Sequence, residues 1–318
     1  MAEYLFDEPR FHDPEIAREH LESVRWPCGP VCPHCGALDR ISKLNGQAHR
    51  PGVYDCGHCR DQFTVTVGTV FEHSKISLDK WLFAATLIAS SKKGVSSKQV
   101  ERMLGVTYKT AWFMTHRLRE AMKPNGGGLL GGGSGTIEAD ETFIGRKPGM
   151  KKRRGYAHKE AIFSLVERKG NVRSFHVADV TANTLKPKLK ENAAPNAHLM
   201  TDDAGQYRNM NKEFAGHDVV NHSAGEYVRG NVHTNTVEGF FSIFKRGMYG
   251  VYQHVSSHHL ERYTTEFDFR YNHRETKVKV DGKWVKAGFT DAERTVALLK
   301  GISGKRLMYA GARQGETV

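Results

Sequence analysis

The chain has 318 residues, of which 39% are hydrophobic, and its formal net charge is +12 at pH 7. This length predicts two or more domains with buried cores. The positive net charge favours a polyanionic partner, most often nucleic acid. A basic but otherwise ordinary soluble protein would have the same charge balance. The longest apolar stretch, 81–89, is too short to span a membrane, and the acidic start does not fit a signal peptide. We therefore expect a cytoplasmic protein.

The five cysteines all lie within residues 1–70, which we assign to a zinc ribbon with an N-terminal extension. Two C-x2-C motifs, "CPHC" and "CGHC", are separated by 20 residues, the spacing of a four-cysteine structural zinc site. A redox pair would explain one motif but not two. The predicted ligands are Cys32, Cys35, Cys56 and Cys59, and Cys28 is left as a spare thiol. We expect the zinc to stabilise the fold and to have no catalytic part.

Three helices are predicted within residues 75–124. The first covers 78–90, the second follows a cap at Ser96 or Ser97, and the third follows a cap at Thr107. A short helix, a glycine turn and a longer basic helix are typical of a helix-turn-helix, although an ordinary three-helix packing unit has the same pattern. The residues expected to pack inward are Val106, Ala111, Trp112 and Leu118. Those expected to meet DNA are Tyr108, Lys109, His116, Arg117 and Arg119.

A glycine-rich stretch at 125–135 predicts a linker, and alternating strand-like and helix-like runs follow over 136–274. Strands are predicted within 135–145, 160–170, 171–180, 197–203 and 217–223, and helices within 181–193, 204–215 and from 234 onward. This order is that of an α/β ribonuclease-H-like domain. The tail, 275–318, has the pattern of a hairpin and a helix with no assigned role.

Three acidic residues of this domain, Asp140, Asp202 and Glu238, are candidates for one metal site. Asp140 has the opposite parity to the apolar residues of its strand, Asp202 ends a strand, and Glu238 begins the last helix. Such carboxylates can hold two Mg²⁺ ions about 4 Å apart, which phosphodiester cleavage needs. Each acid also has a structural interpretation: a surface strand residue, a cap of the following turn, and a capping box with Asn235.

The chain resembles the ISXO-type bacterial insertion-sequence transposases, a group of DDE transposases with an N-terminal zinc ribbon. The resemblance is carried by "CPHCG" with "CGHC", "EADETFIGRK", "LMTDDAGQY" and a long block from "VVNHSAGEY" to "DFRYNHR". It implies a ribonuclease-H-like catalytic domain whose acidic triad is Asp140, Asp202 and Glu238, with Glu141 and Asp203 as second choices. The cofactors implied are two Mg²⁺ ions, for which Mn²⁺ can substitute.

The same resemblance implies binding to terminal inverted repeats, strand cleavage and strand transfer into target DNA by a homodimer or larger assembly on the bacterial nucleoid. A basic loop is expected to hold phosphates. The loop residues are Lys151, Lys152, Arg153 and Arg154, and Asn235, Lys245 and Arg246 of the last helix are expected to contact substrate DNA. His222 and His233 are further candidates for orienting DNA or a water.

Two other classes of function fit the same residues. A DNA-binding regulator, or a domesticated transposase that no longer cuts, would keep the basic front end without the chemistry. A metal-dependent nuclease would cleave DNA without joining it. Retention of all three acids favours the active transposase.

Overall fold

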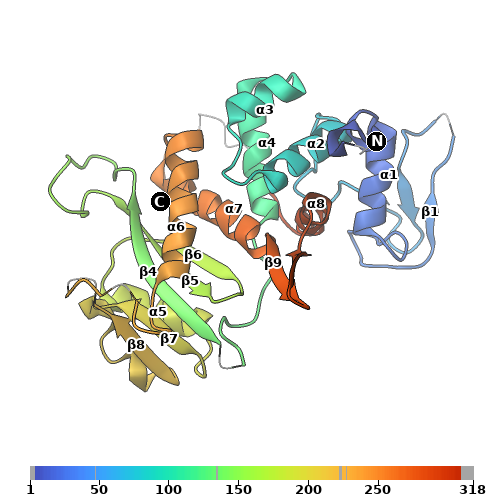
Figure 1. Cartoon of the computed structure of the whole chain (residues 1–318). Helices are drawn as coiled ribbons and strands as arrows, with labels where there is room; N and C mark the ends of the chain where they lie inside the picture. Colours follow the sequence, from blue (N-terminus) through green and yellow to red (C-terminus); the bar gives the residue numbers. More distant parts are fainter. Residues whose placement is uncertain (1–3, 47, 134, 222–223, 227, 309–318) are drawn as a thin grey trace. The chain divides into compact units, whose positions relative to one another are not determined.

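The computed structural model describes residues 4–46, 48–133, 135–221, 224–226 and 228–308. The chain forms two compact units, which Figure 1 shows and which are described separately below. The first unit contains Met1–Ser91, Val95–Lys123 and Glu275–Val318, and the second contains Lys92–Gly94 and Pro124–Arg274. Among the described residues, none of the helices is both long and apolar enough to cross a lipid bilayer.

The N-terminal part of the first unit is a three-stranded antiparallel sheet packed beside a helix that the sequence analysis missed. Two short 3-10 turns, η1 (Leu5–Asp7) and η2 (Pro9–Phe11), precede this helix, α1 (Pro14–Arg25). Asp13 caps α1 by accepting from the backbone N–H of Glu15 and Ile16, and Pro14 begins it, so its start signal was present in the sequence. The strands are β1 (Ile41–Lys43), β2 (Tyr54–Cys56) and β3 (Gln62–Phe63).

The three predicted helices of the first unit are α2 (Leu78–Ser90), α3 (Ser97–Leu104) and α4 (Tyr108–Ala121). The predicted caps are confirmed, because the hydroxyls of Ser96 and Thr107 accept from backbone N–H groups of the following turns. Gly105 ends α3 with φ of +61°, a left-handed conformation that glycine adopts without steric cost.

The C-terminal tail belongs to the first unit, although the whole of the second unit comes before it in the chain. It forms the hairpin β9 (Glu275–Val280) and β10 (Lys283–Gly288), then helix α8 (Asp291–Lys300), which packs on α1, α2 and α4. Arg294 donates to the carbonyl of Ala89 on α2 at 3.2 Å, and Val70 N–H donates to the carbonyl of Ile302 at 3.1 Å. The tail therefore completes the core of the unit that the N-terminus begins.

The second unit is built on a five-stranded sheet in the order β6-β5-β4-β7-β8 (Figure 1). The strands β4, β5 and β6 are antiparallel neighbours, and β7 and β8 run parallel to β4. Their bounds, in chain order, are Thr136–Ile144, Glu160–Glu167, Val172–Val177, His198–Asp202 and Gly216–Val220. The helices are α5 (Ala182–Asn192), α6 (Asn235–Gly247), which continues as the π-helical turn η6 (Met248–Tyr252), and α7 (Leu260–Asn272), preceded by η7 (Ser257–His259).

Each face of this sheet packs a separate core. Odd-numbered residues of β4, such as Ile137 and Ala139, join α5 in one cluster, whereas Ile144 joins α6 and α7 in the other. This alternation is the period of two expected of a strand covered on both faces. The apolar residues Val237, Phe240, Phe241 and Phe244 of α6 are buried in the second cluster, as is Met248, which begins η6.

Two expectations for the second unit are corrected. The helix predicted over 204–215 is replaced by two 3-10 turns, η3 (Gly205–Tyr207) and η4 (Met210–Lys212), because Asn209 between them has φ of +67° and breaks any helix. The glycine-rich linker is also fixed, near its middle. Leu130 is buried and exchanges backbone hydrogen bonds of 2.8 Å with Asn192 and Ala194.

Candidate functional site

Two of the candidate carboxylates lie side by side because of the register of β4 and β7. Glu138 pairs with Met200 in the parallel ladder. Asp140 lies two residues after Glu138 on β4, and Asp202 lies two residues after Met200 on β7. Neighbouring strands are about 4.8 Å apart, so the two aspartates occupy adjacent positions, Asp140 in the middle of β4 and Asp202 at the carboxyl end of β7. They also share a face, since Glu138 and Met200, which have the same parity, both contact Arg168.

The third carboxylate comes to the same face because α6 runs along β4 in the same direction. The N–H groups of Thr236 and Val237 bond to Glu138 near the start of β4, and Met248 shares a cluster with Ile144 at its end. The two lengths agree, since about 18 Å of helix separates Thr236 from Met248 and about 20 Å of strand separates Glu138 from Ile144. Glu238 follows Val237 directly, so it lies close to Asp140 on the same face of the sheet.

Glu138 holds the start of α6 in place, and the sequence analysis did not single it out. Its side chain is fully buried and accepts from the N–H groups of Thr236 and Val237 at 2.7 and 3.0 Å and from the Thr236 hydroxyl at 2.8 Å. A carboxylate at this position satisfies unpaired helix N–H groups and interacts favourably with the helix dipole. The signal available was weak: Glu138 has the parity of Asp140, opposite to Ile137 and Ala139.

This arrangement replaces the capping box that was considered for Asn235 and Glu238. The N-cap residue is Thr234, whose side chain makes no hydrogen bond to a backbone N–H of the first turn. Its hydroxyl donates instead to Glu238 Oε1 at 2.8 Å. Glu138 therefore serves the helix N-terminus, and Glu238 is exposed on the first turn of α6.

Arg168 neutralises Glu138 and ties it to the chain before α6. Its Nε donates to Glu138 Oε1 at 2.6 Å, while its Nη atoms donate to the carbonyls of Asn231 and His233 at 2.7 and 2.8 Å. A buried carboxylate is retained at reasonable cost only when it is paired and hydrogen-bonded, as here. The ion pair therefore links β4, the residue that follows β5 and the start of α6, close to the two aspartates.

We expect Glu138→Ala to lower the free energy of unfolding by about 3–5 kcal/mol, because it leaves Arg168 and the first turn of α6 without their acceptor. Urea denaturation followed by circular dichroism measures this loss. The matched control is Glu167→Ala, since Glu167 on β5 accepts one bond, from Gly131 N–H at 3.2 Å, and should cost about 1 kcal/mol. Equal losses in the two variants would contradict a special role for Glu138.

The carboxylates of the site act on one another. Burial, with the charges of Glu141, Asp202 and Glu238, raises the pKa of Asp140 to about 8. Like charges held close together favour the neutral form, and a bound cation would reverse that effect. The chemistry of the three carboxylates therefore fits a divalent cation, although their oxygens do not form as close a set as the cysteine sulfurs described below.

The two second-choice acids lie differently. Glu141 contacts Tyr207 and Gln206, and Tyr207 belongs to the core on the α5 side of the sheet. Burial raises the pKa of Glu141 to about 7, and the hydrogen bond from the Tyr207 hydroxyl opposes that rise. Asp203 is exposed beyond the end of β7. These positions favour Asp140, Asp202 and Glu238 as the set that shares one face.

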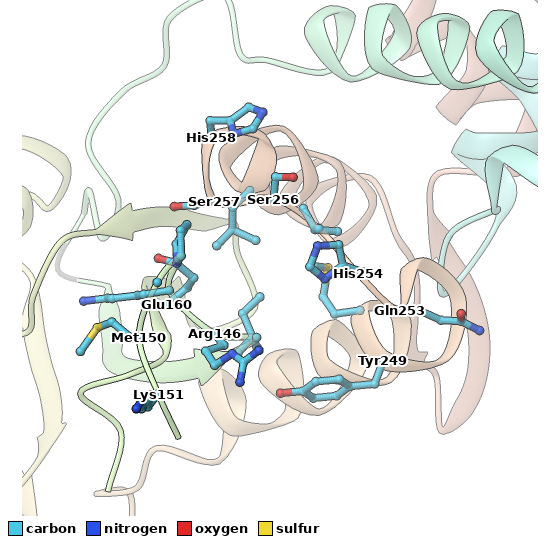
Figure 2. A pocket seen from close by; sticks show the side chains of 18 residues that line it. Arg146, Met150, Lys151, Glu160, Tyr249, Gln253, His254, Ser256, Ser257 and His258 are labelled. Atoms are coloured by element: carbon cyan, nitrogen blue, oxygen red, sulfur yellow. The ribbon is translucent and has the colours of Figure 1, made fainter. Parts of the chain in front are cut away.

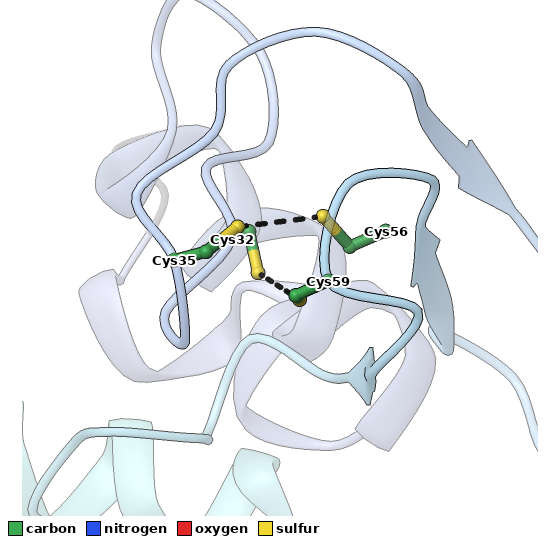
Figure 3. Close-up of side chains that lie close together, drawn as sticks. All are labelled: Cys32, Cys35, Cys56 and Cys59. Carbon is green, nitrogen blue, oxygen red and sulfur yellow. Dashed lines mark hydrogen bonds between the residues drawn. The ribbon is translucent and has the colours of Figure 1, made fainter.

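The four predicted zinc ligands form one cluster in the first unit (Figure 3). Their Sγ atoms all lie within 4.8 Å of one another, with Cys32 and Cys59 3.7 Å apart and Cys35 and Cys56 3.6 Å apart. A tetrahedral ion with Zn–S bonds of about 2.3 Å requires sulfurs about 3.8 Å apart, so the cluster fits zinc. Cys28 is exposed and is not in the cluster.

The prediction that His116, Arg117 and Arg119 lie on the surface and meet DNA is wrong. Arg119 is 1% exposed and donates to the Thr115 hydroxyl at 3.2 Å, and His116 is fully buried. Arg117 is half-buried and donates to the carbonyls of Glu72 and Leu307. Three helices, α2, α3 and α8, pack on α4, which covers more of α4 than a helix-turn-helix alone would cover.

The remaining residues predicted to contact DNA are exposed. Tyr108 and Lys109 lie on the first turn of α4, where the ammonium of Lys98 is 5.0 Å from the centre of the Tyr108 ring. The other exposed candidates are Lys151, Lys152, Arg153, Arg154, Asn235, Lys245 and Arg246. His233 is half-buried beside Arg168, and His222 lies outside the described residues.

Comparison with known proteins finds two matched regions in the chain. Residues 133–272 match the family of the ISXO2-like transposase domain, and residues 13–62 match the transposase zinc-ribbon domain. A Halobacterium salinarum relative, described as an uncharacterized protein in transposable element ISH50, is 29% identical over 271 residues. That alignment covers 79% of this chain and 88% of the relative. The family resemblance seen in the sequence is thus confirmed.

Proposed function

We propose, from the premise that this chain belongs to the ISXO2-like transposase family, that it cuts a DNA strand at the ends of an insertion sequence and joins the freed end to target DNA. The observation that carries the proposal is the position of Asp140, Asp202 and Glu238 on one face of the transposase domain. We assign the catalytic role to these three residues.

The fold supports this assignment. Three antiparallel strands followed by two parallel ones, in the order β6-β5-β4-β7-β8, are the arrangement we expect of a ribonuclease-H-like domain. Asp202 lies at the carboxyl end of β7, the kind of sheet edge at which ligands bind in open sheets, and Asp140 lies beside it on β4. Where the structure describes the 35 residues between Asp202 and Glu238, they form the short elements η3, η4 and β8, which is consistent with an edge open to a long substrate.

DNA binding is proposed for both units. In the first, α3 and α4 form a helix-turn-helix whose exposed first turn, at Tyr108 and Lys109, enters a groove, beside the zinc ribbon. In the second, the loop from Lys151 to Arg154 holds phosphates, and Lys245 and Arg246 extend this basic surface. Such contacts release counterions, so binding should weaken as salt rises.

The chemistry follows from the three carboxylates. Two Mg²⁺ ions, or Mn²⁺ in their place, would be held by Asp140, Asp202 and Glu238 and would stabilise the attacking and leaving oxygens of an in-line displacement. Glu138 and Arg168 fix the helix that carries Glu238, so the third carboxylate keeps its place while DNA binds. Because both element ends must be cut and joined together, we propose a homodimer or larger assembly on DNA.

The test is incubation of the full-length protein with labelled DNA that carries the element's own ends, in the presence of Mg²⁺. The expected result is cleavage at the ends followed by a joined product with target DNA, both separated on denaturing gels. Binding without cleavage would favour a silent DNA-binding regulator. Cleavage with no joined product would favour a nuclease, so each alternative class has its own outcome.

A further inference from the structure

A cavity of about 780 Å³ lies in the second unit, apart from the three carboxylates. It is lined by Ile144 at the end of β4 and residues 145–151 after it, by residues from Met248 to Leu260, where α7 begins, and by Glu160 of β5. Figure 2 shows Met150 and Lys151 on one side and Tyr249 and His254 on the other. Its size is within the range of pockets that enclose small organic ligands.

The walls of this cavity combine an apolar interior with a basic rim. Ile144, Met248 and Leu260 are buried and belong to the core on the α6 side, and Tyr249 is 53% exposed beside them. Arg146, Lys151 and two histidines line the same cavity. An aromatic ring next to apolar side chains provides a surface on which a flat ring can stack, and the cations attract an anion.

One lining residue is a buried acid whose hydrogen bonds are incomplete. Glu160 is 6% exposed, and its Oε2 is 2.8 Å from Nε2 of His176. Its other oxygen, Oε1, is buried with no hydrogen-bond partner among the described residues. An unpaired buried carboxylate oxygen is costly, and native proteins rarely leave one unless a missing group donates to it.

These features select one class of ligand. A phosphate alone would explain the cations but not the acceptor, and an acidic peptide would be repelled by Glu160. A nucleotide supplies a phosphate for the rim, a flat ring for stacking and, in adenine, cytosine and guanine, an amino group that donates a hydrogen bond. We propose that this cavity receives an unstacked, amino-bearing nucleotide of the substrate DNA, an inference that rests on the proposed function for the identity of that substrate.

The position of the cavity agrees with this ligand. Ile144 lies four residues beyond Asp140 on β4 and faces the same side of the sheet. Four residues of strand span roughly 13 Å, which equals the axial rise of about four base-pair steps of stacked DNA. A strand that places a phosphate at the carboxylates can therefore bring a nucleotide a few positions away to the cavity.

The test compares the binding of the full-length protein to fluorescein-labelled duplexes of one arbitrary sequence, without added Mg²⁺. One duplex is blunt, one has a single-stranded overhang of four adenines, and one has four thymines, which lack the amino group. Fluorescence polarisation should give a Kd roughly tenfold lower for the adenine overhang than for the blunt duplex. It should be roughly threefold lower than for the thymine overhang.

Two variants separate the parts of the cavity. Tyr249→Ala should remove the preference for overhangs, and Glu160→Gln should remove the preference for adenine over thymine, since an amide both donates and accepts. The control is Tyr156→Ala, an exposed tyrosine of the same unit that does not line the cavity, which should keep both preferences. Blunt-duplex affinity should be unchanged in the two cavity variants.

Equal binding of the three duplexes by the wild-type protein would overturn the inference, as would preferences that survive Tyr249→Ala. This outcome is independent of Glu160→Gln, should that variant fail to fold. The assay needs neither cleavage nor added metal. An overhang preference in a protein that does not cut DNA would therefore refute the proposed chemistry and leave the cavity assignment standing.

Discussion

Asp140→Asn, Asp202→Asn and Glu238→Gln are each expected to reduce strand cleavage by at least roughly 10³-fold while leaving binding to element ends intact. Each amide keeps the size of the side chain and removes the charge that a divalent cation needs. The expected loss is large because the three carboxylates share one site, so that losing any one of them leaves two ligands. Gel cleavage assays and gel-shift assays measure the two quantities on the same DNA.

The matched controls are the adjacent acids. Asp203→Asn changes an exposed residue beyond the end of β7, and Glu141→Gln changes a residue bonded to Tyr207 on the other side of the sheet. The first control should cut like the wild type. Normal cleavage by a triad variant, or a loss in Asp203→Asn as large as in Asp202→Asn, would show that the catalytic set has been assigned wrongly.

Removal of zinc is expected to unfold the ribbon and to abolish the DNA binding that depends on it. Structural zinc contributes about 10–16 kcal/mol in small domains, more than a three-stranded sheet with strands of two or three residues can replace. Cys32→Ser and Cys56→Ser each remove one buried ligand of the cluster. We expect a lower zinc content by elemental analysis and a changed far-ultraviolet circular dichroism spectrum.

Cys28→Ser is the matched control for the zinc prediction. Cys28 is exposed and stands outside the cluster, so its loss should change neither the zinc content nor the spectrum. An unchanged zinc content in Cys56→Ser would mean that the four sulfurs do not hold the metal. If zinc were lost while the spectrum and DNA binding stayed the same, the ion would have no structural role.

Features that depend on neighbouring residues were predictable from the sequence. The spacing of the two C-x2-C motifs determined the cysteine cluster, because each motif forms a tight turn that presents two sulfurs. Ser96, Thr107 and Gly105 determined the ends of α3 and α4, since caps act within one turn. Alternating parity along β4 was enough to separate Asp140 from the apolar face of its strand.

Features that depend on distant segments were decided only by the tertiary structure. Arg119 has the same local pattern as a surface arginine, yet it is buried in a unit where α2, α3 and α8, the last more than 170 residues later, pack on its helix. Glu138 looks like any strand acid, and it holds α6 because the fold brings Thr236 to it. Local pattern thus determined the elements, the zinc ligands and the candidate acids. Long-range packing decided which charges are buried, and which residue fixes the helix carrying Glu238, because those partners meet only when the whole domain has folded.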